Sequence, residues 1–329
     1  MDWSSHPGMA ALQRLADSQT AGEQGPVAVA YSGGADSTAL LLAAWRLWPQ
    51  RVCALHVNHN LQPAAADFER HVRRVCADWG IPLRVRQVRP TPAARDSLEA
   101  VAREARYAAL ASLAREAGAS TVWLAHHRQD QVETLLLALT RGAGLPGLAG
   151  MPRHMRRHGI GFLRPWLDVD GAALRAWLDA HGVSYVDDPS NQDQRHTRNR
   201  IRHRLLPVLQ ESFPAFAQTF ARSARHAAQA QALLEEMAQA DLQAIGQPPN
   251  IRRLQALSEP RQANVLRLWL RQAGARQASE AQLQQVLRQI AACRTRGHRI
   301  HLRVGQGYLW RQGEVLLYKP DEGAAGPNL

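Results

Sequence analysis

The hydrophobic and polar positions of the chain follow two alternating patterns up to about residue 139. Short apolar runs, such as VAVAYS at 27–32, are typical of strands buried in a sheet. Each run is followed by a longer segment whose apolar residues recur every three or four positions, as on one face of a helix. The alternation predicts an α/β domain with a parallel sheet and helices on both faces. The expected strands are 27–32, 51–57, 82–88 and 120–126, and the expected helices are 37–47, 64–79, 97–117 and 129–139.

The pattern changes in the second half of the chain. Residues 140–166 are rich in glycine, proline and arginine, and this long connection is either functional or a border. A short helix is expected over 171–182. Beyond about residue 213 the segments become long and rich in Ala, Gln and Leu. We expect an N-terminal α/β domain over 1–213 and a mainly helical C-terminal domain over 214–329. The expected C-terminal elements are helices at 216–245, 260–272 and 279–293, then short strands at 299–304, 308–311 and 314–318.

Basic residues outnumber acidic ones, with 40 Lys and Arg against 28 Asp and Glu, and the formal net charge is +12. Lys319 is the only lysine. A genome rich in arginine codons would explain the preference for arginine, but it would not explain the excess of positive charge. Such an excess favours a polyanionic partner, for which nucleic acid is the first candidate.

The cysteine count and the hydropathy pattern restrict the compartment. Cys53, Cys76 and Cys293 are far apart and match neither a zinc motif nor a disulfide framework, so a reducing, cytoplasmic location is expected. No apolar run reaches the roughly 18–20 residues that span a bilayer, and the N-terminus lacks the pattern of a signal peptide. We expect no membrane partner, and the oligomeric state stays open, a homodimer included.

The sequence SGGADS at 32–37 stands between an expected strand and an expected helix. Glycines at such a turn allow backbone N–H groups to converge on an anion, and the dipole of the following helix adds to the attraction. Asp36 repels a phosphate, so it acts either as the helix N-cap or as a ligand of the Mg²⁺ that accompanies a triphosphate. The Walker A loop is excluded because the chain has no Gly-Lys-Ser/Thr. GAGLPG at 142–147 matches GxGxxG, but it follows a helix and contains a proline, so a dinucleotide site is not expected there.

SGGADS resembles the PP-loop, SGGxDS, of the ATP-pyrophosphatase superfamily. ALHVNHNLQPAAADFE, SLEAVAREARYAAL, LAHHRQDQVETLLLALTRGAGLPGLAGM and YVDDPSNQDQRHTRNRIRHRLLP resemble the tRNA(Ile)-lysidine synthetase family, closely over about 25–210 and more loosely beyond. The family often has other residues where this chain has Asn60 and Gln62. The resemblance implies an enzyme that uses ATP and Mg²⁺ to adenylate the C2 carbonyl oxygen of the wobble cytidine in a CAU-anticodon isoleucine tRNA. Free L-lysine then displaces AMP. The C-terminal domain would help to select the tRNA.

The resemblance also implies site residues. ATP would bind at Ser32, Gly33, Gly34, Ala35, Asp36 and Ser37. Metal would bind at Asp36 and Asp130, and lysine at Asp130, Glu133 and His127. The catalytic residues would be Asp36, Arg106, Asp130 and Glu133. The tRNA would contact Arg153, Arg156, Arg157, Arg198, Asn199 and Arg202.

Simpler explanations remain open for several of these residues. Asp130 and Glu133 would complement a helix dipole in any protein. Arg200, Arg202 and Arg204 suit a solvated basic face. His126 and His127 suit either a structural role or a neutral base that accepts a proton from an amine.

An interleaving of aromatic residues with arginines marks the 153–166 segment. Phe162 and Trp166 alternate there with Arg153, Arg156, Arg157 and Arg164. Such a segment suits an unstacked RNA base.

Two other functions compete with lysidine formation. A PP-loop enzyme that thiolates a tRNA base needs paired or clustered cysteines, and this chain offers none in its sequence. A non-catalytic RNA-binding protein would not need an intact SGGADS together with Asp130 and Glu133. Release of pyrophosphate from ATP separates an enzyme from a binding protein.

Overall fold

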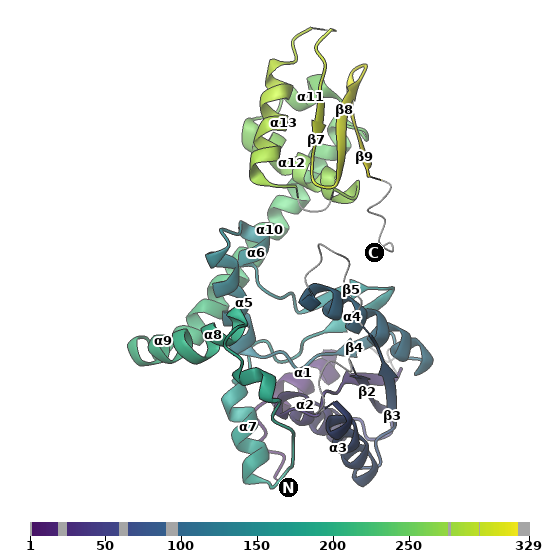
Figure 1. Cartoon of the computed structure of the whole chain (residues 1–329), viewed down its shortest axis with the longest axis vertical. Coiled ribbons are helices and arrows are strands. Elements are labelled where there is room, and N and C mark those ends of the chain that lie inside the picture. The colour runs from purple at the N-terminus through teal and green to yellow at the C-terminus, as the bar shows by residue number, and fades with distance from the viewer. Residues whose placement is uncertain are drawn as a thin grey trace. The chain divides into compact units, whose positions relative to one another are not determined.

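The computed structural model describes residues 2–18, 25–58, 65–89, 98–275, 278–295 and 297–321. The chain divides into two compact units, Met1–Ala228 and Gln229–Leu329. This division lies inside the long helix α10, Phe216–Ile245 (Figure 1). The boundary between two folding domains that the sequence predicts at residues 213 and 214 is not tested by this division and stays a prediction.

The first unit is built on a six-stranded sheet with the strand order β3-β2-β1-β4-β6-β5. Every neighbouring pair is parallel except β5 and β6, which are antiparallel. The parallel sheet expected from the sequence is therefore confirmed. The strands are β1 (Val27–Ala30), β2 (Val52–Asn58), β3 (Leu83–Gln87), β4 (Thr121–Trp123), β5 (His154–Arg157) and β6 (Ile160–Leu163).

The β5–β6 hairpin was not expected, because 140–166 reads as a connection. The two strands meet in a tight turn at His158 and Gly159, which both have positive φ, 49° and 77°. Turns of this type suit the twist of a hairpin, but their usual signal is Asn-Gly or Asp-Gly rather than His-Gly. β5 carries arginines and lies at the edge of the sheet, where a polar strand is normal.

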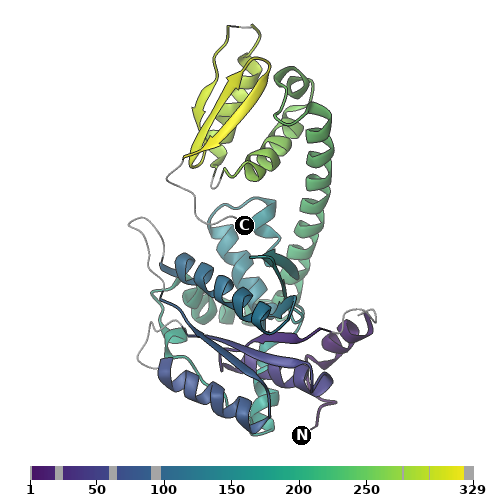
Figure 2. The ribbon, with the colours of Figure 1, turned by 90° about the vertical axis from the view of Figure 1, so that its right-hand side faces the viewer.

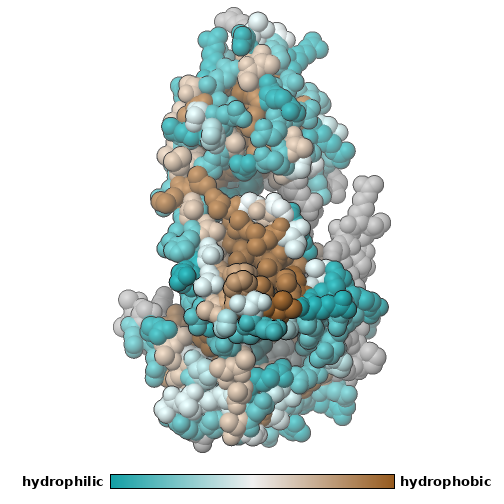
Figure 3. Space-filling view, turned by 90° about the vertical axis from the view of Figure 1, so that its left-hand side faces the viewer, coloured by the Kyte–Doolittle hydropathy of each residue, from teal (hydrophilic) through white to brown (hydrophobic). Residues whose placement is uncertain are grey.

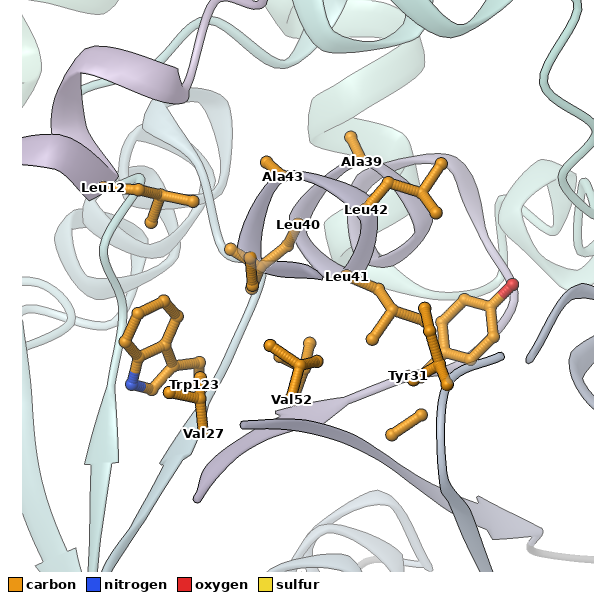
Figure 4. Packing of buried hydrophobic residues seen from close by; sticks show 14 of the residues in the cluster. Leu12, Val27, Tyr31, Ala39, Leu40, Leu41, Leu42, Ala43, Val52 and Trp123 are labelled. Atoms are coloured by element: carbon orange, nitrogen blue, oxygen red, sulfur yellow. The ribbon is translucent and has the colours of Figure 1, made fainter. Parts of the chain in front are cut away.

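Helices cover both faces of the sheet, as the sequence predicts. Buried residues of α1, α2, α3 and α7 form one core cluster with the sheet, and buried residues of α4 form another. The helix α2 is buried nearly all round because its sequence, ADSTALLLAAWRL, is almost continuously apolar. Leu40 and Leu41 of α2 pack near Val27, Val52 and Trp123 of the sheet (Figure 4). The bounds are α1 Met9–Ser18, α2 Ala35–Leu47, α3 Ala65–Asp78, α4 Leu98–Glu116, α5 Arg128–Thr140, α6 Leu145–Leu148 and α7 Gly171–Ala180.

A short irregular region joins the sheet domain to α10. It holds a 3₁₀ turn (Pro189–Gln192), the helix α8 (Thr197–Arg200), a π-helical turn (Ile201–Leu205) and α9 (Leu206–Ser212). π-helical turns are rare and occur frequently at functional sites. This segment carries the arginine-rich sequence singled out above.

The second unit is mainly helical with a small antiparallel sheet, as expected (Figure 2). Leu266 and Val286 of its helices share a core with Leu309 and Leu316 of its strands, and all four are at most 1% exposed. Besides the end of α10, its elements are α11 (Ile251–Gln255), α12 (Glu259–Gln272), α13 (Glu280–Ala292), β7 (His301–Arg303), β8 (Gly307–Gln312) and β9 (Val315–Pro320).

Not all large apolar residues lie in a core. A patch of apolar surface is visible in Figure 3. The exposed large apolar side chains of the first unit include Leu139, Leu205, Val208 and Phe213. Among the helices in the described ranges, none is both long and apolar enough to cross a membrane.

Candidate active site

The carboxyl ends of β1 and β4 lie side by side, because Val29 of β1 is paired with Trp123 of β4. The turns that leave these two strands therefore reach the same edge of the sheet. In open α/β sheets this edge is where ligands bind. It brings together two segments that the sequence analysis singled out, Ser32–Ser37 and His126–Asp130.

The turn at 32–37 is held by its own hydroxyl groups. Ser37 Oγ donates to the carbonyl oxygen of Gly34 at 3.0 Å and accepts from the N–H of Ser32 at 3.2 Å. Thr38 Oγ1 donates to the same Gly34 carbonyl at 2.9 Å. Gly33 has φ +89°, and a Cβ there would lie 3.1 Å from Val72 Cγ2 of α3. The backbone of the turn is thus shaped as an anion-binding turn at the start of α2.

Asp130 and Glu133 lie on the first turns of α5. Asp130 Oδ2 accepts a hydrogen bond at 3.0 Å from the N–H of His127, the N-cap of this helix. Asp130 therefore stabilises the start of α5, which is the structural role that the sequence also allowed for it. Glu133 is fully buried, and a buried carboxylate requires charged or hydrogen-bonding partners.

Two arginines supply those partners, Arg198 from α8 and Arg202 from the π-helical turn that follows it. Arg198 Nε donates to Glu133 Oε2 at 2.6 Å, and Arg202 Nε donates to Glu133 Oε1 at 2.7 Å. Arg202 Nη2 also reaches Glu133 Oε2 at 3.0 Å, and Arg198 Nη2 donates to Asp130 Oδ1 at 3.1 Å. Two of the residues predicted to bind tRNA are therefore paired, in this structure, with two of the residues predicted to bind lysine.

His127 links the PP-loop helix to this cluster. Its Nε2 atom lies 3.5 Å from Asp36 Oδ2 and 3.5 Å from Asp130 Oδ2. Burial opposes a charge on His127, but Asp130 and Asp36 outweigh it and raise the pKa of His127 to about 9. His127 is therefore an imidazolium at neutral pH, so it does not match the neutral base considered from the sequence.

His126, the preceding residue, has the opposite character. Burial lowers the pKa of His126 to about 4, so this imidazole is neutral at neutral pH. Its buried Nδ1 atom has no hydrogen-bond partner within the described ranges. Of the two histidines, His126 is the one that matches a neutral base.

The structure places the other predicted residues in three different settings. Arg106 is exposed on α4, and Arg156 is exposed on the edge strand β5. Arg153 and Arg157 form ion pairs, with Asp168 at 2.5 Å and with Glu104 at 3.1 Å. Asn199 is buried, and its side-chain amide donates to the carbonyl oxygen of Asp193. The roles proposed for these five residues stay predictions.

The expectation of an RNA-stacking segment at 153–166 is wrong for its aromatic residues. Phe162 and Trp166 are 0% exposed and Arg164 is 1% exposed, so they belong to the core. Arg164 donates to the carbonyl oxygen of Pro152 and to the hydroxyl of Tyr107. Phe162 belongs to β6, which is largely buried, and Arg164 and Trp166 follow directly after this strand and are buried as well.

Sequence reasoning missed two residues beside the site. Gly171, at the start of α7, lies against His127, because a Cβ there would be only 2.7 Å from the imidazole ring. Arg175, one turn later, donates to Asp187 at 2.9 Å, and its guanidinium lies over the ring of Tyr185. Neither belongs to a recognisable motif; the only signal was their position on a short helix between two motifs.

The donor set fits a Mg²⁺ ion at Asp36. Asp36 is partly exposed at the start of α2, and Mg²⁺ in nucleotide sites is commonly held by one or two carboxylates together with phosphates. Asp130 is less accessible, since its oxygens face His127 and Arg198. Within the described ranges, no group of three or more His, Cys, Asp or Glu side chains could hold a metal by itself.

The second unit contains a basic cleft of about 740 Å³. Arg252, Arg294, Arg299 and Arg311 line it together with Trp310, and Glu314 is the acidic residue in the lining. Arg311 also holds the loop beside the cleft, because its Nη1 donates to the carbonyl oxygens of Thr295 and His298. A cleft of this charge suits an anionic partner.

Comparisons with known proteins agree with this geometry. Residues 9–209 match the family model of the PP-loop domain, and residues 250–316 match that of the TilS substrate binding domain. The chain is 55% identical to a tRNA(Ile)-lysidine synthase of Polaromonas naphthalenivorans over 96% of both chains. It is 44% identical to a tRNA(Ile)-lysidine synthase of Ralstonia nicotianae, over 92% of this chain and 66% of that protein.

A solved structure supports the fold alone. It is a U34-tRNA thiolase from Methanococcus maripaludis with its [4Fe-4S] cluster, 12% identical, with a TM-score of 0.57 over 67% of this chain and 77% of that one. The cysteines of the present chain are all buried. Burial raises the pKa of the Cys76 thiol to about 12 and that of Cys53 above its usual value, which opposes thiolate chemistry.

The fold, the turn at 32–37 and the match over 9–209 together define a PP-loop ATP-binding protein. The 55% identity over nearly the full length and the match to the TilS substrate binding domain define the family more narrowly. The chain belongs to the tRNA(Ile)-lysidine synthase family.

Proposed function

We propose that this protein ligates L-lysine to the C2 position of the wobble cytidine in a CAU-anticodon isoleucine tRNA. The reaction consumes ATP, passes through an adenylated cytidine, and releases pyrophosphate and then AMP. One observation carries the proposal: a PP-loop turn and a carboxylate pair lie at one sheet edge, in a chain 55% identical to a tRNA(Ile)-lysidine synthase.

The turn at 32–37 would hold the phosphates that leave as pyrophosphate. Its backbone N–H groups and the start of α2 favour negative charge, and the hydroxyls of Ser32 and Ser37 would turn from their contacts within the loop to the phosphate oxygens. Asp36 would hold a Mg²⁺ ion, which neutralises phosphate charge when bound with ATP. The guanidinium of Arg106 would stabilise negative charge that develops during adenylation.

The carboxylates of Asp130 and Glu133 would bind the ammonium groups of lysine. The amine that attacks the cytidine must lose a proton, and neutral His126 suits this task better than charged His127. His127 would instead keep Asp36 and Asp130 in place through its two contacts of 3.5 Å.

Binding of tRNA would use basic surfaces of both units. In the first unit, Arg153, Arg156 and Arg157 lie on or next to the edge strand β5. In the second unit, the basic cleft at Trp310 would contact the phosphate backbone. Phosphate contacts release counterions, so binding would weaken steeply with salt.

The decisive experiment measures incorporation of labelled lysine into tRNA transcripts in the presence of ATP and Mg²⁺. The CAU isoleucine tRNA should become labelled, and the CAU methionine tRNA should not. Pyrophosphate release without lysine incorporation would retain the PP-loop chemistry but require another nucleophile. Release of no pyrophosphate with either tRNA would contradict the proposal.

A paired variant tests the role of Asp36. Asp36→Asn should lower pyrophosphate release by at least about 100-fold while filter-binding affinity for tRNA changes little. Asp78→Asn, an exposed aspartate at the end of α3, is the control. Turnover by Asp36→Asn at the control's rate would exclude the metal role.

A further inference from the structure

Arg198 and Arg202 cover the carboxylates of the site on their solvent side. The side chain of Glu133 is 0% exposed and that of Asp130 is 13% exposed. The side chains of Arg198 and Arg202 are 33% and 35% exposed. A cation that approaches Glu133 from solvent therefore meets the two guanidinium groups first.

Asp130 and Glu133 already have guanidinium partners. Arg198 pairs with both carboxylates, at 3.1 Å and 2.6 Å, and Arg202 pairs with Glu133 at 2.7 Å. An ammonium group added beside these two carboxylates would find neither of them unpaired, and buried charge without a partner is costly.

The segment that carries the two arginines is unusual in its geometry. Arg198 belongs to the short helix α8, and Arg202 belongs to the π-helical turn at 201–205. Both guanidinium groups reach the same carboxylate, Glu133. Arg200 and Arg204 of this segment make other contacts, to Thr197 and to Gln194.

Phosphate competes well for guanidinium groups, because it accepts the same paired hydrogen bonds as a carboxylate. Arg202 Nη2 lies 3.7 Å from Asp130 Oδ1. Asp130 is linked in turn to Asp36, on the helix that begins at the PP-loop, because His127 Nε2 lies 3.5 Å from a carboxylate oxygen of each. A phosphate bound at this turn would attract the same side chain.

We propose that Arg198 and Arg202 occupy the lysine subsite in the ligand-free enzyme and leave it for phosphate, so that lysine binds only after a phosphate-bearing substrate. The inference rests on the proposed function, because it takes Asp130 and Glu133 as the lysine ligands. Exchange of one anionic partner for another keeps both arginines paired throughout. The two arginines would thereby set the order of substrate binding.

Lysine affinity of the ligand-free enzyme tests this directly, by calorimetry or by equilibrium dialysis with labelled lysine. The substitution Arg202→Gln removes one cation that competes with lysine, while the side-chain amide that it introduces still donates to Glu133. This variant should bind lysine about tenfold more tightly than the wild type, because a larger fraction of the molecules then has a lysine subsite that is open to lysine. Arg204→Gln loses the same charge from the same segment but not from the cluster, and should bind lysine as the wild type does.

The wild-type protein provides a second measurement that needs no variant. Lysine affinity is compared in the absence of ligand, with pyrophosphate, with a non-hydrolysable ATP analogue and with the tRNA transcript. An increase with the first two identifies the nucleotide as the phosphate source, and an increase with the transcript alone identifies RNA. The thermal midpoint of Arg202→Gln is recorded alongside, to show that the variant is folded.

Two results would overturn the inference. One is equal lysine affinity of Arg202→Gln and Arg204→Gln, and the other is wild-type lysine affinity that no phosphate source changes. Either result with lysine still transferred to the isoleucine tRNA would leave the proposed function intact. Absence of lysine transfer under all conditions would instead remove the proposed function, and this inference with it.

Discussion

The turn at 32–37 and the cluster around Glu133 lie at the same edge of one sheet, but they handle charge in different ways. The turn uses backbone groups and local hydroxyls, and its hydrogen bonds join residues at most five apart. The cluster uses mainly contacts between side chains, and its shortest ion pair joins Arg198 to Glu133 across 65 positions of the chain. A site of the first kind tolerates no change of backbone, whereas a site of the second kind can exchange partners.

The largest expected effect concerns stability and the cluster. Glu133→Gln removes the buried carboxylate to which Arg198 and Arg202 both donate. Because these two side chains are 33% and 35% exposed, the loss should be about 2–3 kcal/mol, below the cost of breaking a fully buried pair. Urea denaturation should show this loss. Glu104→Gln removes a half-exposed partner of Arg157 and should cost about 1 kcal/mol or less. Equal losses in the two variants would show that the cluster is no more than a surface network.

The pH dependence of stability tests His127. Its pKa is raised from about 6.5 to about 9, so its stabilisation is complete below about pH 6.5 and is lost as pH rises through about 9. A pKa difference of this size corresponds to on the order of 3 kcal/mol. Unfolding free energies measured between pH 6 and 10 should fall accordingly, and His127→Gln should flatten that part of the curve. A wild-type curve that already matches the variant would refute the bridging role.

Gly33→Ala tests the backbone-built turn. The residue would be held at φ +89°, which is strained for any side chain, and its Cβ would lie 3.1 Å from Val72, so Val72 or the turn must yield slightly. A misplacement of about 1 Å can lower a rate about 100-fold, so a smaller shift of the turn should lower pyrophosphate release by about tenfold or more. Gly80→Ala has a similar positive φ, +62°, but meets nothing within 4 Å, so it isolates the steric effect. Similar activity of the two variants would mean that the turn adapts.

Gly171→Ala should have the smallest effect, and it tests the bridge that His127 forms between Asp36 of the PP-loop helix and Asp130 of the cluster. Its Cβ would lie 2.7 Å from the His127 ring and push the imidazole from between Asp36 and Asp130. Activity should fall about tenfold, and the pKa of His127 measured by NMR should move back towards its ordinary value. Gly25→Ala, which meets nothing within 4 Å, is the control. An unchanged His127 titration would show that the ring accommodates the methyl group.

Local patterns were sufficient for most of the fold and for one half of the site. The alternation of apolar runs determined the parallel sheet and its covering helices, because burial on a strand or a helix imposes a fixed spacing. The SGGADS turn was recognisable because glycine, hydroxyl groups and a helix start must be contiguous to bind an anion. The β5–β6 hairpin was not predicted because its turn residues, His158 and Gly159, differ from the Asn-Gly or Asp-Gly that usually marks a hairpin turn.

The partners of the charged side chains were decided by tertiary structure alone. From the sequence, Arg198 was a predicted tRNA contact, Arg202 was either a tRNA contact or part of a basic face, and Glu133 was either a lysine ligand or a helix carboxylate. No spacing rule connects residues so far apart in the chain. For both His126 and His127 the sequence left open a structural role or that of a neutral base, and it predicted only His127 to bind lysine. Burial lowers the pKa of His126 and keeps it neutral, whereas Asp130 of α5 and Asp36 of α2 raise the pKa of His127. Charge and pKa depend on the local dielectric and on distances of a few ångströms, which exist only after the chain has folded.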